Sequence, residues 1–147
     1  TRLAPALSTV IASAGQGNTR GQTSLLTFES YVNQSVVVLT ANPRASSACH
    51  LFFELERRYQ AFRRISDAHS SRGSLTTKLL AQLPAVLPPS TVVSGFDGMA
   101  MQLVERIATS RRESSTLAAL RDTLLPKLIS GELRLNNADR FIEGTAQ

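Results

Sequence analysis

The sequence predicts a mixed α/β (α+β) domain that is followed by one long α-helix. Three observations support this fold class. Short β-branched runs alternate with turn residues over positions 1–40, a helix with an apolar face and an arginine face follows, and an amphipathic segment then runs from Thr91 to Ser130. A helix of that last length measures roughly 60 Å at 1.5 Å per residue, so its apolar stripe needs a partner helix.

The first forty residues are predicted to form strands and loops. The segments 8–13 and 31–39 are the expected strands, because both are rich in β-branched residues. Between them, residues 14–24 hold three glycines among amides, hydroxyls and one arginine, without the spacing of a dinucleotide or Walker loop. Arginine suits guanine, and asparagine or glutamine suits adenine, although a polar surface hairpin explains the same residues. The candidates for base contact are Gln16, Asn18, Arg20 and Gln22.

A helix is predicted to be capped near residues 46–47 and to extend to Ile65. Its apolar face is expected to be core, and its other face carries four arginines. Such a face is usually solvated, but against a duplex it would bind phosphates without regard to sequence. A short helix is expected to open at residues 76–77, where free backbone N–H groups suit a phosphate. The candidates from these two helices are Arg63, Arg64 and Lys78.

The long helix is predicted to lie between a proline pair and a glycine. The pair Pro88-Pro89 ends the first domain, and Gly131 can adopt the left-handed conformation that closes a helix. The expected division is a recognition domain over 1–89, a spacer and dimerisation helix over 90–131, and a short strand with a polar tail over 132–147. Apolar residues recur along the helix with heptad spacing. The predicted dimerisation stripe consists of Phe96, Met99, Leu103, Ile107, Leu117, Leu120 and Leu124.

Charge and composition restrict the function classes. The formal net charge is +5, and residues 1–89 carry the whole excess with nine basic and four acidic side chains, while residues 90–147 carry seven of each. This asymmetry favours a front domain that meets a polyanion and a helix that meets protein. The single cysteine and the lack of a membrane-length apolar run favour the cytoplasm and no membrane contact. No zinc-ligand cluster, nucleophile–base pair or methyltransferase tetrapeptide is found, so no catalytic residue, metal or cofactor is predicted.

Four segments carry a resemblance to a known family. The run 120–133, Leu-Arg-Asp-Thr-Leu-Leu-Pro-Lys-Leu-Ile-Ser-Gly-Glu-Leu, resembles the conserved-region helix of the specificity subunits of type I restriction–modification enzymes. Upstream, 32–39 resembles the Asn-Gln strand of their target-recognition domain, 71–80 its glycine-serine loop and short helix, and 83–89 the run into the long helix. The family usually has Glu-Gln soon after the proline pair, where this chain has Val92-Val93.

The resemblance implies a non-catalytic subunit that recognises DNA. Such subunits pack two long helices as an antiparallel coiled coil, so that each recognition domain reads one half of a bipartite double-stranded target. Because this chain has one domain and one helix, it is expected to self-associate through the helix. Methyltransferase and restriction subunits are the implied partners, and S-adenosylmethionine, ATP and Mg belong to them. The loop with Ser71 and Arg72 is implied to face DNA, and further strands are expected before Thr1.

Two other interpretations stay open. The chain could instead be a helix-mediated dimerisation scaffold whose truncated or non-functional recognition domain does not bind DNA. The early start within the domain favours this alternative, and the charge asymmetry opposes it. A single-strand or RNA binder is a third interpretation, but aromatic residues make up only 5% of the chain and are expected to be core, which leaves few for base stacking.

Overall fold

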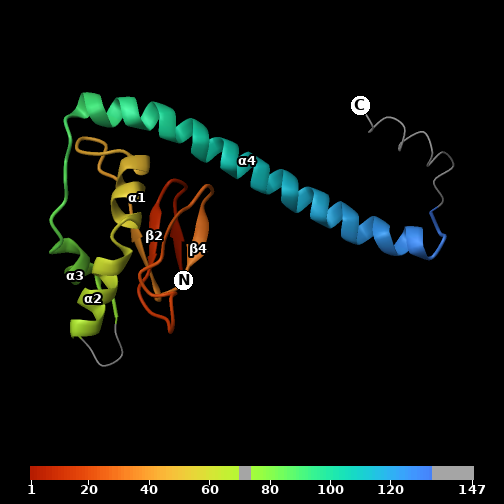
Figure 1. The fold of residues 1–147 in the computed structure, drawn as a ribbon, viewed down its shortest axis with the longest axis horizontal. Helices are drawn as coiled ribbons and strands as arrows, with labels where there is room; N and C mark the ends of the chain where they lie inside the picture. Colours follow the sequence, from red (N-terminus) through yellow and green to blue (C-terminus); the bar gives the residue numbers. More distant parts are fainter. Residues whose placement is uncertain (70–73, 134–147) are drawn as a thin grey trace. The chain divides into compact units, whose positions relative to one another are not determined.

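The computed structural model describes residues 1–69 and 74–133. Figure 1 follows the chain from the strands through three short helices into the long helix α4. The chain forms two compact units, Thr1–Arg106 and Ile107–Gln147, and their boundary falls inside α4. The predicted α+β class with a long C-terminal helix is confirmed, whereas the division at residue 89 stays a prediction.

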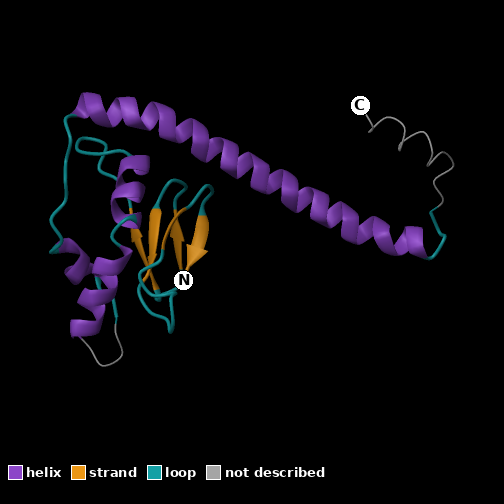
Figure 2. Cartoon of the chain, viewed as in Figure 1, coloured by secondary structure: helices purple, strands orange, loops and turns teal. Residues whose placement is uncertain are grey.

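The strands of the first unit form two small antiparallel sheets, drawn in orange in Figure 2. In one, β1 (Arg2–Ala4) pairs with β4 (Ser30–Val32). In the other, β2 (Thr9–Ala12) lies between β3 (Thr23–Leu25) and β5 (Val36–Leu39). The central strand β2 therefore carries the glycine loop at one end, because that loop connects it to β3.

The single strand predicted over residues 31–39 is two strands in the structure. Asn33 makes the break, since its side-chain Oδ1 accepts from the Ser35 N–H at 3.0 Å and its carbonyl accepts from Val36 at 3.3 Å. Asparagine favours this local turn over a continued ladder. The part before the turn belongs to the ribbon of β1 and β4, and the part after it belongs to the three-stranded sheet.

The first predicted helix is likewise two helices. Helix α1 (Ala48–Glu56) begins at Ser47, whose hydroxyl accepts from the His50 N–H at 3.1 Å. The chain then turns at Arg57 before α2 (Tyr59–His69). The short α3 (Thr77–Ala81) begins at Thr76, whose hydroxyl accepts from the Leu79 N–H at 3.3 Å. Both hydroxyl caps satisfy backbone donors that the first turn of a helix leaves free.

The hydrophobic core joins the three-stranded sheet to the helices. Ile11 of β2, Phe62 of α2, Leu75 and Leu80 are buried together, with half-buried side chains from β5 and α1 around them. A backbone hydrogen bond from the Leu75 N–H to the Ser13 carbonyl, 2.8 Å long, fixes the segment before α3 to the end of β2. The expected core face of the helical segment is confirmed at Phe62, which is fully buried.

Helix α4 (Ser90–Ile129) is 40 residues long and starts directly after the proline pair. The carbonyl of Pro89 accepts from the Val92 and Val93 N–H groups, which opens the helix. Gly131 has φ +75° and donates to the Leu128 carbonyl, as the sequence predicts for a glycine that closes a helix. Of the predicted segment 132–147, residues 132 and 133 are described and form a bend, and the rest lies outside the described residues. None of the helices among the described residues is long and apolar enough to cross a membrane.

Candidate functional site

The glycine loop between β2 and β3 is held against helix α2. The Tyr59 hydroxyl donates to the Asn18 carbonyl at 2.9 Å, and Nη1 of Arg63 donates to the Gly17 carbonyl at 2.6 Å. A third connection joins the Arg20 guanidinium to the Asp67 carboxylate. These contacts link segments about forty residues apart in the sequence, and they fix a loop that would otherwise be free to move.

Gly21 allows the loop to approach α2 closely. Its φ is +86°, a conformation that residues with a side chain rarely adopt. A Cβ at this position would lie 3.2 Å from the Phe62 Cβ and 3.6 Å from the Tyr59 ring. The glycine therefore meets two requirements, the left-handed turn and the close packing of loop on helix.

The structure separates the four loop candidates into two groups. The side chains of Gln16, Asn18 and Gln22 are exposed, as a base-contacting residue requires. Arg20 is only 9% exposed and is paired with Asp67. The sequence predicts Arg20 to be a surface donor, but in the structure this side chain attaches the loop to α2. A contact between Arg20 and DNA stays a prediction, and it would require that ion pair to open.

The basic candidates outside the loop also differ in their surroundings. Arg64 on α2 and Lys78 on α3 are exposed, while Arg63 is half-buried with one guanidinium nitrogen already bonded to the loop. Ser71 and Arg72 lie outside the described residues. The structure thus brings Arg63 to the glycine loop, and no contact among the described residues joins Lys78 to it.

A polar hollow of about 530 Å³ lies beside the loop and contains residues that the sequence analysis missed. Asn18 and Gln22 line it together with Glu56 and Gln60, which come from the end of α1 and the start of α2. No sequence pattern marks the last two, because they are ordinary polar residues of a helical surface until the fold places them next to the loop. The remaining lining residues are Thr23, Ser24 and Tyr59. We call this feature the amide–carboxylate hollow.

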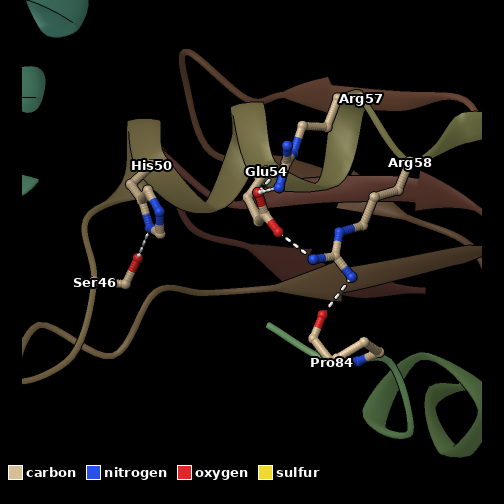
Figure 3. A network of polar contacts seen from close by, with 6 residues as sticks. All are labelled: Ser46, His50, Glu54, Arg57, Arg58 and Pro84. Atoms are coloured by element: carbon tan, nitrogen blue, oxygen red, sulfur yellow. Dashed lines mark hydrogen bonds and ion pairs between the residues drawn. The ribbon is translucent and has the colours of Figure 1, made fainter. Parts of the chain in front are cut away.

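Two more arginines of the predicted basic face are bound within the domain, as Figure 3 shows. Glu54 pairs with both Arg57 and Arg58, and Arg58 also donates to the Pro84 carbonyl. Burial alone raises the pKa of the Glu54 carboxyl, but the hydrogen bonds from the two arginines outweigh it and hold the pKa below its ordinary value. The network connects α1 to the segment that leads into α4. In the same view, the Ser46 hydroxyl lies 2.8 Å from Nδ1 of His50.

The predicted dimerisation stripe is largely exposed along α4. Phe96 is half-buried and packs edge-to-face on Phe53 of α1, with ring centroids 5.8 Å apart. Val93 and Ala100 are the buried positions of α4 among the described residues. The other stripe residues are between 43% and 67% exposed. They are Met99, Leu103, Ile107, Leu117, Leu120 and Leu124.

Among the described residues, the side chains that could bind a metal or act as a nucleophile are poorly placed for either role. No group of three or more His, Cys, Asp or Glu side chains gathers among residues 1–69 and 74–133. Cys49 is buried, and burial together with the nearby charge and hydrogen bond of Asp97 raises its pKa to about 11. A thiol with that pKa is almost entirely protonated at neutral pH and is a poor nucleophile.

Comparison with known proteins gives one partial similarity. No protein-family profile matches the chain. A stretch of 50 residues is 36% identical to the type I restriction enzyme MjaIX specificity subunit of Methanocaldococcus jannaschii. The aligned stretch covers 34% of this chain and 12% of that protein. The similarity therefore supports a partial relationship to a specificity subunit, and it covers a small part of that relative's length.

Proposed function

We propose that the chain is a DNA sequence-recognition subunit of a type I restriction–modification system and binds one half of a bipartite double-stranded target. The observation that carries this proposal is the similarity over 50 residues to a specificity subunit. The front domain supports it, because exposed amide side chains project from a loop that is fixed on a helix with basic residues. Amides suit base edges, and arginine and lysine suit phosphates.

The second part of the proposal is self-association through α4, antiparallel and two-fold symmetric. Four residues of the stripe support it because their positions are symmetric about Ser110. Leu103 and Leu117 lie seven positions before and after Ser110, and Phe96 and Leu124 lie fourteen positions before and after it. In an antiparallel pair related by a two-fold axis at Ser110, each of these four apolar residues therefore meets another of the four, which favours a self-complementary interface.

Charge complementarity favours the same arrangement near its centre. Arg106 lies four residues before Ser110 and Glu113 three residues after it, and both are exposed. In the antiparallel arrangement the Arg106 of one copy and the Glu113 of the other lie at nearly the same height on the same side of the seam. The antiparallel dimer then contains two Arg106–Glu113 ion pairs. In a parallel dimer, by contrast, Arg106 would lie opposite Arg106 and Glu113 opposite Glu113.

The remaining parts of the proposal concern partners and chemistry. The subunit recruits methyltransferase and restriction subunits in the cytoplasm and has no catalytic residue of its own. S-adenosylmethionine, ATP and Mg belong to those partner subunits.

A specific observation favours the alternative of a dimerisation scaffold that does not bind DNA. Arg20, Arg57 and Arg58 are all committed to carboxylates inside the domain. Fewer basic side chains of the domain are therefore available to phosphates than the sequence suggests. A scaffold needs only the helix and would tolerate this loss.

Binding to duplex DNA over a salt series separates the two functions. If Arg63, Arg64 and Lys78 contact phosphates, the logarithm of the association constant should fall with the logarithm of salt concentration with a slope of roughly −3 for one copy. Arg64→Ala should reduce that slope by about one without changing the preferred sequence. Arg111→Ala on α4 is the matched control and should leave the slope unchanged. Absent or salt-independent binding would favour the scaffold.

A further inference from the structure

The amide–carboxylate hollow contains a carboxylate, Glu56, for which the described part of the chain supplies no counter-ion. Glu56 is exposed and forms no ion pair with any described residue, although Glu54, two positions earlier, pairs with two arginines. Asn18 and Gln22 line the hollow on the side of the loop, and Gln60 lines it next to Glu56. An unneutralised carboxylate next to a surface that binds a polyanion is repelled by it, unless it accepts a hydrogen bond there.

We propose that this hollow is a base-reading site, in which Glu56 accepts a hydrogen bond from the exocyclic amino group of a base. In the major groove, that donor is N4 of cytosine or N6 of adenine, and a carboxylate can only accept. The amides of Asn18, Gln22 and Gln60 can both donate and accept, as the adjacent base edges require. This inference rests on the proposed DNA recognition and adds the residues and the base chemistry that give it specificity.

The rigidity of the site favours recognition over incidental contact. The loop wall is attached to α2 by the Tyr59 hydroxyl and by Arg63, and Gly21 keeps it close to the helix. Amide side chains on such a fixed loop lose less conformational freedom on binding than those on a mobile one. The guanidinium of Arg63, which is bonded to the Gly17 carbonyl of the same loop, also supplies a positive charge that attracts the backbone of the duplex.

A carboxylate is also a means of rejecting wrong sequences. Where the base edge presents an acceptor, such as O6 of guanine or O4 of thymine, the Glu56 carboxylate faces another acceptor and binding is penalised. Glu56→Gln removes that penalty, because the amide can donate to those oxygens. The substitution keeps the shape of an exposed side chain, so the fold should be retained.

The experiment is selection of preferred duplexes from a randomised library with the full chain and with its Glu56→Gln variant. We expect the variant to lose discrimination at one base position by about ten-fold or more, with the other positions unchanged. The base lost at that position, cytosine or adenine, identifies the amino group. Glu29→Gln is the matched control, since Glu29 is an exposed carboxylate of the same unit outside the hollow. It should strengthen binding to all sequences slightly and leave the preference unchanged.

The outcomes distinguish this inference from the function on which it rests. If the parent chain selects a sequence but Glu56→Gln behaves like Glu29→Gln, the hollow does not read bases while DNA recognition stands. If Gln60→Ala also leaves the preference unchanged, neither Glu56 nor Gln60, the two helical polar residues of the hollow, reads a base. If the parent chain binds no duplex in a salt-dependent manner, the proposed function and this inference both fail.

Discussion

Replacement of Leu103 by aspartate on α4 is the sharpest test of self-association. Leu103 is 64% exposed, and Leu117, which we expect it to meet across the seam, is 65% exposed. Because so much of Leu103 is already in solvent, the substitution should cost the isolated chain only a few tenths of a kcal/mol in helix propensity. The dimer, in contrast, should lose the burial of this side chain in both copies.

The size of that loss follows from the exposure. Full burial of a leucine side chain is worth about 1.5–3 kcal/mol, so burying the exposed two thirds of Leu103 is worth about 1–2 kcal/mol. The two-fold symmetry doubles this to about 2–4 kcal/mol for the dimer. The dissociation constant should therefore rise by about 30- to 1000-fold, and further because a carboxylate enters an apolar seam.

Sedimentation equilibrium of the parent chain and the variant measures this change, and circular dichroism verifies that the variant is folded. Ser115→Asp is the matched control, because it adds the same charge to an exposed position on the opposite side of α4 from the stripe. It should leave the dissociation constant within about two-fold of the parent value. A folded Leu103→Asp variant that dimerises as tightly as the parent would refute the helix pairing.

Three further predictions concern the first unit, and urea unfolding measures all of them. Gly21→Ala should destabilise the domain more than Gly17→Ala, because both have positive φ but only the Cβ at Gly21 meets α2; equal losses would contradict the close packing. Asp67→Asn should cost about 1 kcal/mol, since Asp67 is 58% exposed and its pairing with Arg20 is partly screened; an unchanged midpoint would show that the pair does not hold the loop. Glu54 has a lowered pKa in the fold, so it stabilises the domain above the unfolded pKa and this contribution is lost as pH falls through the folded pKa. Glu54→Gln should therefore lower stability at neutral pH and flatten the acid limb, and a parallel pH profile would exclude this role.

The sequence predicts the elements whose signal is local. The 40-residue helix follows from a heptad pattern between a proline pair and a glycine, and all these signals lie within the helix or at its ends. The N-terminal caps of α1 and α3 fall where hydroxyl residues precede apolar runs. The strand over 31–39 and the helix to Ile65 are each predicted as one element and are broken in the structure. A single turn at Asn33 and another at Arg57 outweigh the apolar periodicity around them.

The sequence predicts the candidate site less completely than it predicts the helices and strands. The sequence identifies the loop and its exposed amides, because glycines and polar residues mark a turn without reference to the rest of the chain. It assigns Arg20 to the surface, although the tertiary structure pairs it with Asp67 forty-seven positions away. It also misses Glu56 and Gln60, which become part of the hollow only when the α1–α2 junction packs next to the loop.

Local chemistry thus determines which segments become helix, strand or turn, and it gives the basic excess and the apolar stripe. Which of the arginines remain available to a partner depends on the tertiary structure, because a charge is neutralised by whichever residue lies next to it in space. The sequence gives the number of charged residues. Which arginines are paired with carboxylates inside the domain is decided by the packing of the loop on α2 and of Glu54 against its two arginines.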